Sequence, residues 1–155
     1  MAPENCDYCK KVGIDFSTSP YNKEAVDLCA KMKVPFIKIG SGEITWLEMI
    51  EYIASKNIPI MLATGDATMS EIDEAIRVIE KTGNKDLVLM QCITNYPSKI
   101  DSANVNVLKT YQSAFDCLTG YSDHSPGHVV ALASVVLGGR VIEKHFTLNK
   151  NDKGP

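Results

Sequence analysis

The sequence predicts an α/β fold made of repeated strand–helix units. Short apolar runs alternate with amphipathic helical segments, and successive runs begin 20 to 30 residues apart. Such alternation is typical of a doubly wound parallel sheet or of a (β/α)8 barrel. No dinucleotide fingerprint follows the first run, because "GSGE" at 40–43 lacks the GxGxxG spacing. A complete barrel needs eight strands and roughly 250 residues. The 155 residues and six runs of this chain therefore predict either an open sheet or part of a barrel.

Six apolar runs are expected to form the strands. Few polar residues interrupt their Val, Ile, Leu and Phe, which is the pattern of strands buried on both faces of a parallel sheet. In chain order the runs are 13–19 (GIDFSTS), 34–43 (VPFIKIGSGE), 58–66 (IPIMLATGD), 86–95 (DLVLMQCITN), 116–124 (DCLTGYSDH) and 140–147 (RVIEKHFT).

Five helices are expected between these runs. Three of them have apolar residues three and four positions apart, the spacing of a helix with one buried face. The five segments are 25–32, 47–54, 72–79, 105–115 and 128–138. Thr68 and Glu71 have the capping-box spacing for the start of the third helix. Every run except the last is thus followed by a helix, as a βα repeat requires.

Composition and charge exclude several classes of function. The net charge of -3 and the absence of a Lys or Arg run argue against a nucleic-acid partner. No segment approaches the roughly 18 apolar residues of a membrane span, and the N-terminus lacks the apolar core of a signal peptide. We therefore expect a cytoplasmic protein with no membrane partner. The five cysteines are expected to be reduced, with Cys6 and Cys9 on a helix rather than in a zinc or redox motif.

Polar residues at the ends of the runs are the candidate functional residues, because ligands of α/β folds bind at the carboxyl ends of the strands. Every run ends in hydroxyl groups, a charge or an imidazole. Glu43 is an acid in an apolar setting. The residues suited to binding a phosphate are Thr18, Lys38, Ser41 and Ser122.

Lys38 lies inside the apolar run "FIKIG". Burying an unpaired ammonium costs several kcal/mol, so this lysine is expected to meet an anion such as a phosphate or a carboxylate. The alternative is a lysine that extends from the strand edge to solvent or pairs with Glu43.

His124 and His145 end consecutive runs, which places them side by side in a barrel. Two neutral imidazoles can bind a divalent metal and leave coordination positions for water and substrate. The alternative is that both are structural histidines. His128 begins the following helix and is expected to be a surface or capping residue.

The motifs at these strand ends resemble those of the sialic acid synthases. In order they are FSTSPYNKEAVD, PFIKIGSGEITW, LATGDATMSEIDEAI, MQCITNYP, GYSDHSPG and VIEKHFTLNKNDKGP, and the resemblance runs from about Val12 to Pro155. Family members have an N-terminal (β/α)8 TIM barrel and a small C-terminal antifreeze-like domain. The resemblance implies that residues 1–155 form an incomplete barrel of about strands three to eight, with the first two βα units and the C-terminal domain absent.

The resemblance also implies an activity. The family consists of transferases that condense phosphoenolpyruvate with an N-acetylated hexosamine, either N-acetylmannosamine or a diacetamido analogue, to give a nonulosonic acid and phosphate. C3 of phosphoenolpyruvate attacks the open-chain aldehyde, water adds to the resulting oxocarbenium carbon, and phosphate leaves. The parent protein is expected to be a homodimer.

Roles for individual residues follow from the same resemblance. The residues implied to hold the phosphate and carboxylate of phosphoenolpyruvate are Thr18, Lys38, Ser41 and Ser122. Glu43 is implied to act as the acid or base near water or the sugar hydroxyls, and Lys38 is implied to be catalytic as well as phosphate-binding. His124 and His145 would bind the divalent metal, Mn²⁺ or Mg²⁺. Thr94 and Tyr96 would contact the sugar.

Two positions depart from the family pattern, and two other functions stay open. Ala63 stands where many members carry a phosphate-binding serine, and Thr94 stands where some carry asparagine. One alternative is a catalytically inactive barrel fragment with residual phosphate or metal binding. The other is a different aldol-type synthase or a sugar-phosphate aldolase, for which only Lys38 and Lys144 have the context of a Schiff-base lysine.

Overall fold

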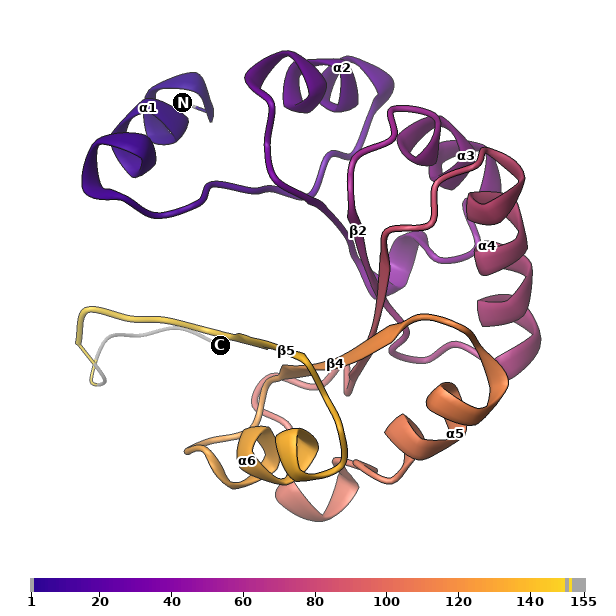
Figure 1. The fold of residues 1–155 in the computed structure, drawn as a ribbon. Helices are drawn as coiled ribbons and strands as arrows, with labels where there is room; N and C mark the ends of the chain where they lie inside the picture. Colours follow the sequence, from indigo (N-terminus) through magenta and orange to yellow (C-terminus); the bar gives the residue numbers. More distant parts are fainter. Residues whose placement is uncertain (1, 150, 152–155) are drawn as a thin grey trace. The chain divides into compact units, whose positions relative to one another are not determined.

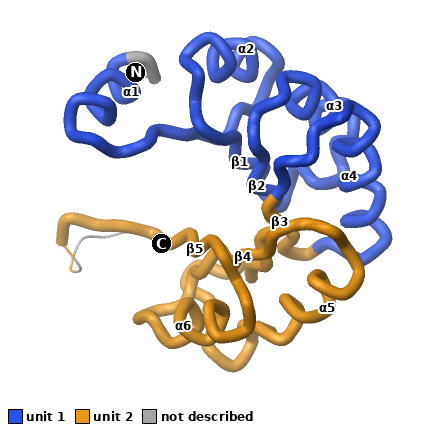
Figure 2. The backbone as a smooth tube through the Cα atoms, in the orientation of Figure 1, with its two compact units in different colours: residues 1–62, 67–87 blue, residues 63–66, 88–155 orange. Residues whose placement is uncertain are grey.

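The computed structural model describes residues 2–149 and 151 (Figure 1). The chain divides into two compact units, one formed by residues 1–62 and 67–87 and the other by residues 63–66 and 88–155 (Figure 2). Among the described residues, no helix combines the length and apolar character needed to cross a membrane.

The first unit holds four helices and a pair of parallel strands. Its elements are α1 (Ala2–Val12), α2 (Lys23–Met32), β1 (Ile37–Ile39), the short 3-10 helix η1 (Ser41–Glu43), α3 (Leu47–Ala54), β2 (Ile60–Ala63, whose last residue belongs to the second unit) and α4 (Met69–Lys81). Ile37 pairs with Ile60 and Ile39 with Leu62, and all four side chains are buried. Helix α3 packs against both α2 and α4, and the apolar residues Val26, Ile50 and Ile76 of the three helices are buried.

Local signals set where these helices begin. The side chain of Asn22 accepts a hydrogen bond from the backbone N–H of Ala25 and so caps α2. At α4, Thr68 and Glu71 form the reciprocal capping box that the sequence predicts, which confirms that expectation. Cys6 and Cys9 lie on α1, as expected, and all five cysteines are free thiols.

The second unit contains three parallel strands in chain order. Its elements are β3 (Leu87–Cys92, whose first residue belongs to the first unit), the 3-10 helix η2 (Ile100–Ser102), α5 (Val107–Ala114), β4 (Leu118–Asp123), α6 (Val129–Val136) and β5 (Val141–Lys144). In the ladder, Cys92 pairs with Ser122, and Ser122 pairs with Glu143. Both α5 and α6 pack against β4 (Figure 1).

Side chains alternate between the two faces of β4, as strand geometry requires. Tyr121 packs with Ala103 and with Val130 of α6, while Thr119 accepts a hydrogen bond from Gln112 of α5. These contacts mark the helix-covered face of the strand. Ser122, one residue further, therefore points to the opposite face.

The expectation of a strand at 13–19 is wrong, so five of the six expected strands form within the described residues. The segment is extended but makes only isolated contacts with the first strand region. The backbone N–H of Lys38 donates to the carbonyl of Thr18, and the hydroxyl of Ser17 donates to the carbonyl of Phe36. Pro20, which follows directly, has no N–H to extend a ladder. The five expected helices form as α2 to α6.

Candidate active site

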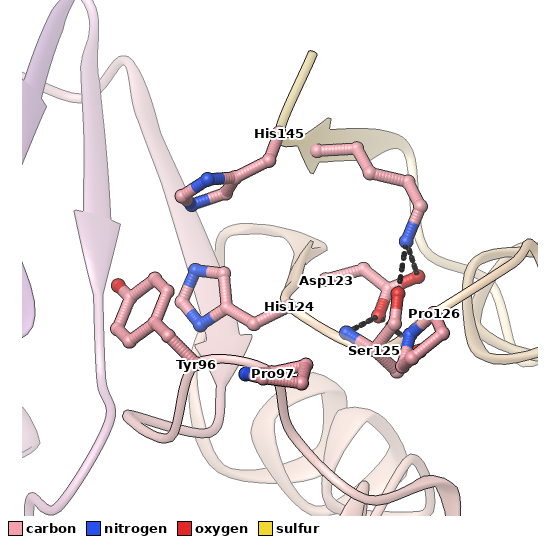
Figure 3. Close-up of a pocket in the computed structure, with 8 residues that line it drawn as sticks. Tyr96, Pro97, Asp123, His124, Ser125, Pro126 and His145 are labelled. Atoms are coloured by element: carbon pink, nitrogen blue, oxygen red, sulfur yellow. Dashed lines mark hydrogen bonds and ion pairs between the residues drawn. The ribbon is translucent and has the colours of Figure 1, made fainter. Parts of the chain in front are cut away.

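A pocket of about 250 Å³ opens in the second unit, at the carboxyl ends of its strands (Figure 3). Three short segments line it, one after β3, one at the end of β4 and one at the end of β5. The lining residues are Tyr96, Pro97, Asp123, His124, Ser125, Pro126, Lys144 and His145. In a parallel α/β fold this edge of the sheet is where ligands bind.

His124 is the first residue after β4, and its ring is fixed by the backbone of the neighbouring segment. Its Nδ1 lies 2.6 Å from the carbonyl oxygen of Ile93, and its Nε2 lies 3.4 Å from the hydroxyl of Ser122. A protonated Nδ1 donates to that carbonyl, and this tautomer leaves Nε2 as the unprotonated nitrogen. Metal-binding histidines are usually oriented in this way.

His145 follows β5 and completes a cluster of three rings. The ring centroids of His124 and His145 are 5.3 Å apart, with the rings nearly perpendicular at 87°. Tyr96 stacks on His124 at 4.1 Å and lies tilted against His145 at 5.3 Å. Figure 3 shows the three rings facing one another across the pocket. The predicted neighbourhood of the two histidines is present.

The donor set fits a divalent transition metal held by two imidazoles. The described residues contain no group of three or more His, Cys, Asp or Glu side chains that could hold a metal ion. Two nitrogen donors favour a transition metal such as Mn²⁺ over Mg²⁺, which takes oxygen ligands almost exclusively.

Asp123 and Lys144 form an ion pair that lines the same pocket. Their Oδ2 and Nζ atoms are 2.8 Å apart, and the Asp123 side chain is fully buried. Lys144 also donates to the carbonyl of Ser125, whose own N–H and hydroxyl donate to Oδ1 of Asp123. Burial acts to raise the pKa of Asp123, but the hydrogen bonds from Lys144 and Ser125 outweigh it, and the pKa is lowered. Asp123 is thus an ionised, fully paired carboxylate.

The sequence gives no sign that these two residues form a pair, although Lys144 has the context of a Schiff-base lysine. Both residues were visible at the ends of their runs, but nothing in the sequence placed one opposite the other. The signal that would have found them is the strand register, because Asp123 and Lys144 are direct partners in the β4–β5 ladder.

Glu143, to which the sequence analysis gave no role, accepts a hydrogen bond from Ser122. The Ser122 hydroxyl donates to Oε1 of Glu143 at 2.9 Å, and the Ser122 side chain is buried. Ser122 was predicted to bind phosphate. In this structure its hydroxyl proton is donated to the carboxylate of Glu143, and phosphate binding by Ser122 stays a prediction.

Thr94 and Tyr96, the predicted sugar contacts, follow β3. The hydroxyl of Thr94 donates to Oδ2 of Asp66 at 2.5 Å, and Asp66 adopts a left-handed backbone conformation with φ of 59°. The Tyr96 side chain is half exposed, with one face against His124. His128 is exposed at the N-cap of α6, as expected, although its side chain makes no capping hydrogen bond.

The remaining predicted residues lie together in the first unit, along β1 and the turn that follows it. Lys38 is half-buried between the buried Ile37 and Ile39, and its backbone N–H bonds to the carbonyl of Thr18. Ser41 and Glu43 lie on η1, directly after β1. Ser41 and Glu43 thus follow the carboxyl end of β1, Lys38 lies within that strand, and Thr18 meets it through its backbone carbonyl. Their expected role in binding phosphoenolpyruvate stays a prediction.

The chain is similar in sequence and in structure to known proteins. The model of the NeuB family matches residues 2–155. The N,N'-diacetyllegionaminic acid synthase of Campylobacter jejuni is 43% identical over 150 residues, which cover 96% of this chain and 45% of that protein. The crystal structure of the spore coat polysaccharide biosynthesis protein SpsE from Bacillus subtilis superposes with a TM-score of 0.92 at 34% identity, over 96% of this chain and 42% of that one.

A sialic acid synthetase is also among the similar structures. The N-acetylneuraminic acid synthetase of Leptospira borgpetersenii, crystallised with citrate, gives a TM-score of 0.88 at 29% identity, over 92% of this chain and 50% of that one. The chain spans about half the length of these relatives or less. The expected α/β fold, an incomplete (β/α)8 barrel, is confirmed by these superpositions. The resemblance to the sialic acid synthases is likewise confirmed, and the chain belongs to the NeuB family.

Proposed function

We propose that this chain is barrel sequence of a nonulosonic acid synthase, which condenses phosphoenolpyruvate with an N-acetylated hexosamine. The observation that carries the proposal is the cluster of His124, His145 and Tyr96 beyond the carboxyl ends of three neighbouring parallel strands, in a chain of the NeuB family. Its named relatives include a diacetyllegionaminic acid synthase and a sialic acid synthetase.

The proposed reaction forms one carbon–carbon bond and one carbon–oxygen bond, the latter from water, and breaks the carbon–oxygen bond to phosphate. C3 of phosphoenolpyruvate bonds to the aldehyde carbon of the open-chain sugar, and the aldehyde oxygen takes up a proton. Water then adds at C2 and loses a proton. The bond between C2 and the phosphate oxygen breaks, which releases inorganic phosphate and leaves the 2-keto acid.

The residues of the second unit would bind and orient the acceptor sugar. His124 and His145 would hold a divalent metal, whose contribution when bound is Lewis-acid polarisation of the aldehyde oxygen. Tyr96 packs one ring face on His124 and so limits the rotation of that imidazole. Its half-exposed side chain and the Thr94–Asp66 pair offer hydroxyl and carboxylate groups to sugar hydroxyls or amides.

The residues of the first unit would bind phosphoenolpyruvate. Lys38 supplies a cation in an apolar strand. Thr18, whose carbonyl accepts from the Lys38 backbone N–H, and Ser41, three residues after Lys38, supply hydroxyl groups. Glu43 follows on η1 and would exchange a proton with water or with the sugar hydroxyls. These roles are supported by the position of Ser41 and Glu43 directly after the carboxyl end of β1.

The experiment measures metal binding and turnover in matched histidine variants. Mn²⁺ affinity is followed by electron paramagnetic resonance, and phosphate release is followed with phosphoenolpyruvate and either N-acetylmannosamine or a 2,4-diacetamido sugar. Loss of a direct ligand in His124→Ala should abolish measurable Mn²⁺ binding, whereas the exposed His128→Ala should bind as the unmodified chain does. Equal affinity in both variants would exclude His124 as a ligand.

A second candidate function is binding without turnover. It is favoured by the coverage, since the chain corresponds to only 45% of the Campylobacter jejuni synthase. This candidate predicts Mn²⁺ binding that depends on His124, with no phosphate release by the 155-residue chain. Phosphate release by the chain alone would exclude it.

The structure disfavours an aldolase that works through a Schiff base on Lys144. Such a lysine must bring its nitrogen to a substrate carbonyl, whereas Nζ of Lys144 is held by Asp123 at 2.8 Å and by the carbonyl of Ser125 at 2.7 Å. Borohydride trapping with a carbonyl substrate should therefore leave Lys144 unlabelled, as peptide mass analysis would show.

A further inference from the structure

We propose that the ion pair between the buried Asp123 and the partly exposed Lys144 positions the two histidines, by fixing the carboxyl ends of β4 and β5 relative to each other. The inference rests on the proposed function for its metal, but its geometric part concerns the protein alone. Asp123 and Lys144 would be positioning residues that act through His124 and His145.

The strand register places the pair directly beside the histidines. Asp123 and Lys144 are the last residues of their strands and are partners in the parallel ladder. His124 and His145 are the next residues along each strand. Any slip or separation of the two strand ends therefore changes the distance between the imidazoles, whose centroids are 5.3 Å apart.

The core alone does not fix the end of β5. None of its four residues is fully buried, and the Ile142 side chain is 37% exposed. Only four residues form the strand, so the ladder with β4 is short. Polar contacts must therefore supply what apolar burial does not.

The Asp123 side chain supplies such contacts in one defined arrangement. Its carboxylate is fully buried and accepts three hydrogen bonds, from Lys144, from the N–H of Ser125 and from the Ser125 hydroxyl. A buried carboxylate without these donors is strongly unfavourable, so the neighbouring strand and loop are tied to it. Buried ion pairs add little net stability, but they favour one register over others.

Lys144 extends this link to the loop after β4. Its ammonium also donates to the carbonyl of Ser125 at 2.7 Å, so one side chain of β5 bonds to both ends of the 123–125 segment. His124 lies between those two bonded residues. Figure 3 shows the hydrogen-bonded group of Asp123 and Ser125 beside the His124 ring.

A second contact acts on the opposite face of the same strands. Ser122 and Glu143, also ladder partners, bond through the Ser122 hydroxyl. Successive residues of a strand point to opposite faces, so the two pairs hold β4 and β5 from both sides. Of the two, the Asp123 pair is the one with a fully buried carboxylate.

The test compares Lys144→Met with Lys144→Arg. Removing the ammonium leaves Asp123 without its partner, and we expect the Mn²⁺ dissociation constant to rise about 10- to 100-fold, as when groups that orient a metal ligand are lost. Lys144→Arg keeps the charge and should restore most of the affinity. Because Lys144→Met can fail to fold, the double variant Asp123→Asn/Lys144→Met, which leaves no unpaired charge, is measured beside it and should show the same loss.

A readout without metal separates positioning from general stability. In the metal-free chain, NMR cross-peaks between the Tyr96 ring and the two imidazoles report the ring cluster. These cross-peaks should weaken in the double variant and persist in Leu108→Ala, which removes a fully buried side chain of α5 away from the pocket. Leu108→Ala should lower the unfolding temperature yet leave the Mn²⁺ dissociation constant unchanged well below that temperature.

The outcomes distinguish this inference from the proposed function. Unchanged cross-peaks and unchanged Mn²⁺ affinity in the double variant would overturn the positioning role, and so would an equal loss in Leu108→Ala. If the unmodified chain binds no Mn²⁺ but its cross-peaks depend on Lys144, the metal role fails and the positioning role stands. If the unmodified chain binds Mn²⁺ and the affinity does not depend on Lys144, the positioning role fails and the metal role stands.

Discussion

Gly120 should be the position in β4 least tolerant of a side chain. It pairs with Met90 of β3 and with Val141 of β5. A Cβ at this position would lie 2.5 Å from the carbonyl oxygen of Val141 and 2.5 Å from the sulfur of Met90. The methionine side chain can move, but the Val141 carbonyl belongs to the backbone of β5. Gly120→Ala can therefore be accommodated only by moving the strand.

The size of the effect follows from that displacement. A real Cβ contact is almost never shorter than 3.0 Å, so the carbonyl must retreat by at least 0.5 Å. Overpacking of this kind costs about 1–3 kcal/mol. For a chain of this size each kcal/mol lowers the unfolding temperature by about 2–4 °C. The movement of β5 also carries His145 with it, so Mn²⁺ binding should weaken as well.

Thermal and urea unfolding, followed by circular dichroism, measure the loss. Gly42→Ala is the matched control, because a Cβ there meets nothing within 4 Å and the backbone is not left-handed. Gly42→Ala should leave the free energy of unfolding unchanged or raise it by up to about 1 kcal/mol, because alanine lowers the conformational entropy of the unfolded chain. The amide of Arg140, which donates to the carbonyl of Thr119, should exchange faster in Gly120→Ala. Wild-type stability and exchange in Gly120→Ala would refute the close approach of β4 and β5.

Three further predictions concern contacts away from the pocket. Thr68→Ala removes the cap of α4 and should lower the free energy of unfolding by about 1 kcal/mol in urea titrations. Hydrogen bonds from the Thr68 backbone and hydroxyl lower the pKa of Glu71. The ionised Glu71 carboxylate therefore contributes its full stabilisation above the unfolded-state pKa of about 4.3. This contribution to the free energy of unfolding is lost as the pH falls through the lower folded-state pKa. Glu71→Gln and the unmodified chain should thus have the same stability in acid but different stabilities at pH 7. Tyr121→Phe removes the donor to the buried carbonyl of Ala103 and should cost about 1–3 kcal/mol, and an unchanged urea midpoint would show that the carbonyl finds another donor.

The elements that the sequence predicted well are those whose formation depends on local pattern. The helices follow the spacing of apolar residues, and the start of α4 follows from the Thr68–Glu71 spacing. The segment 13–19 reads as a strand by its apolar content, yet a strand also needs a partner along its length. Here only the Thr18 carbonyl accepts from Lys38, and Pro20 ends any further ladder. Pairing is a tertiary property, and composition does not report it.

The same distinction applies to the site. The positions of His124 and His145 at strand ends could be predicted, because a strand end is visible in the chain. The partnership of Asp123 with Lys144 could not, because it depends on the register between two strands 21 residues apart. A shift of one residue would place Lys144 on the other face of the sheet. The sequence thus located the imidazoles but not the contacts that orient them.

The least buried strand of the second unit is the one that carries His145. Strand β5 has no fully buried residue, whereas five of the six residues of β4 are buried. A strand held by apolar burial alone tolerates small shifts, since apolar contacts are not directional. Hydrogen bonds between fixed register partners are directional. The Asp123–Lys144 and Ser122–Glu143 pairs therefore define the position of His145 more sharply than a larger apolar contact would, and the proposed metal binding by two histidines would depend on that position.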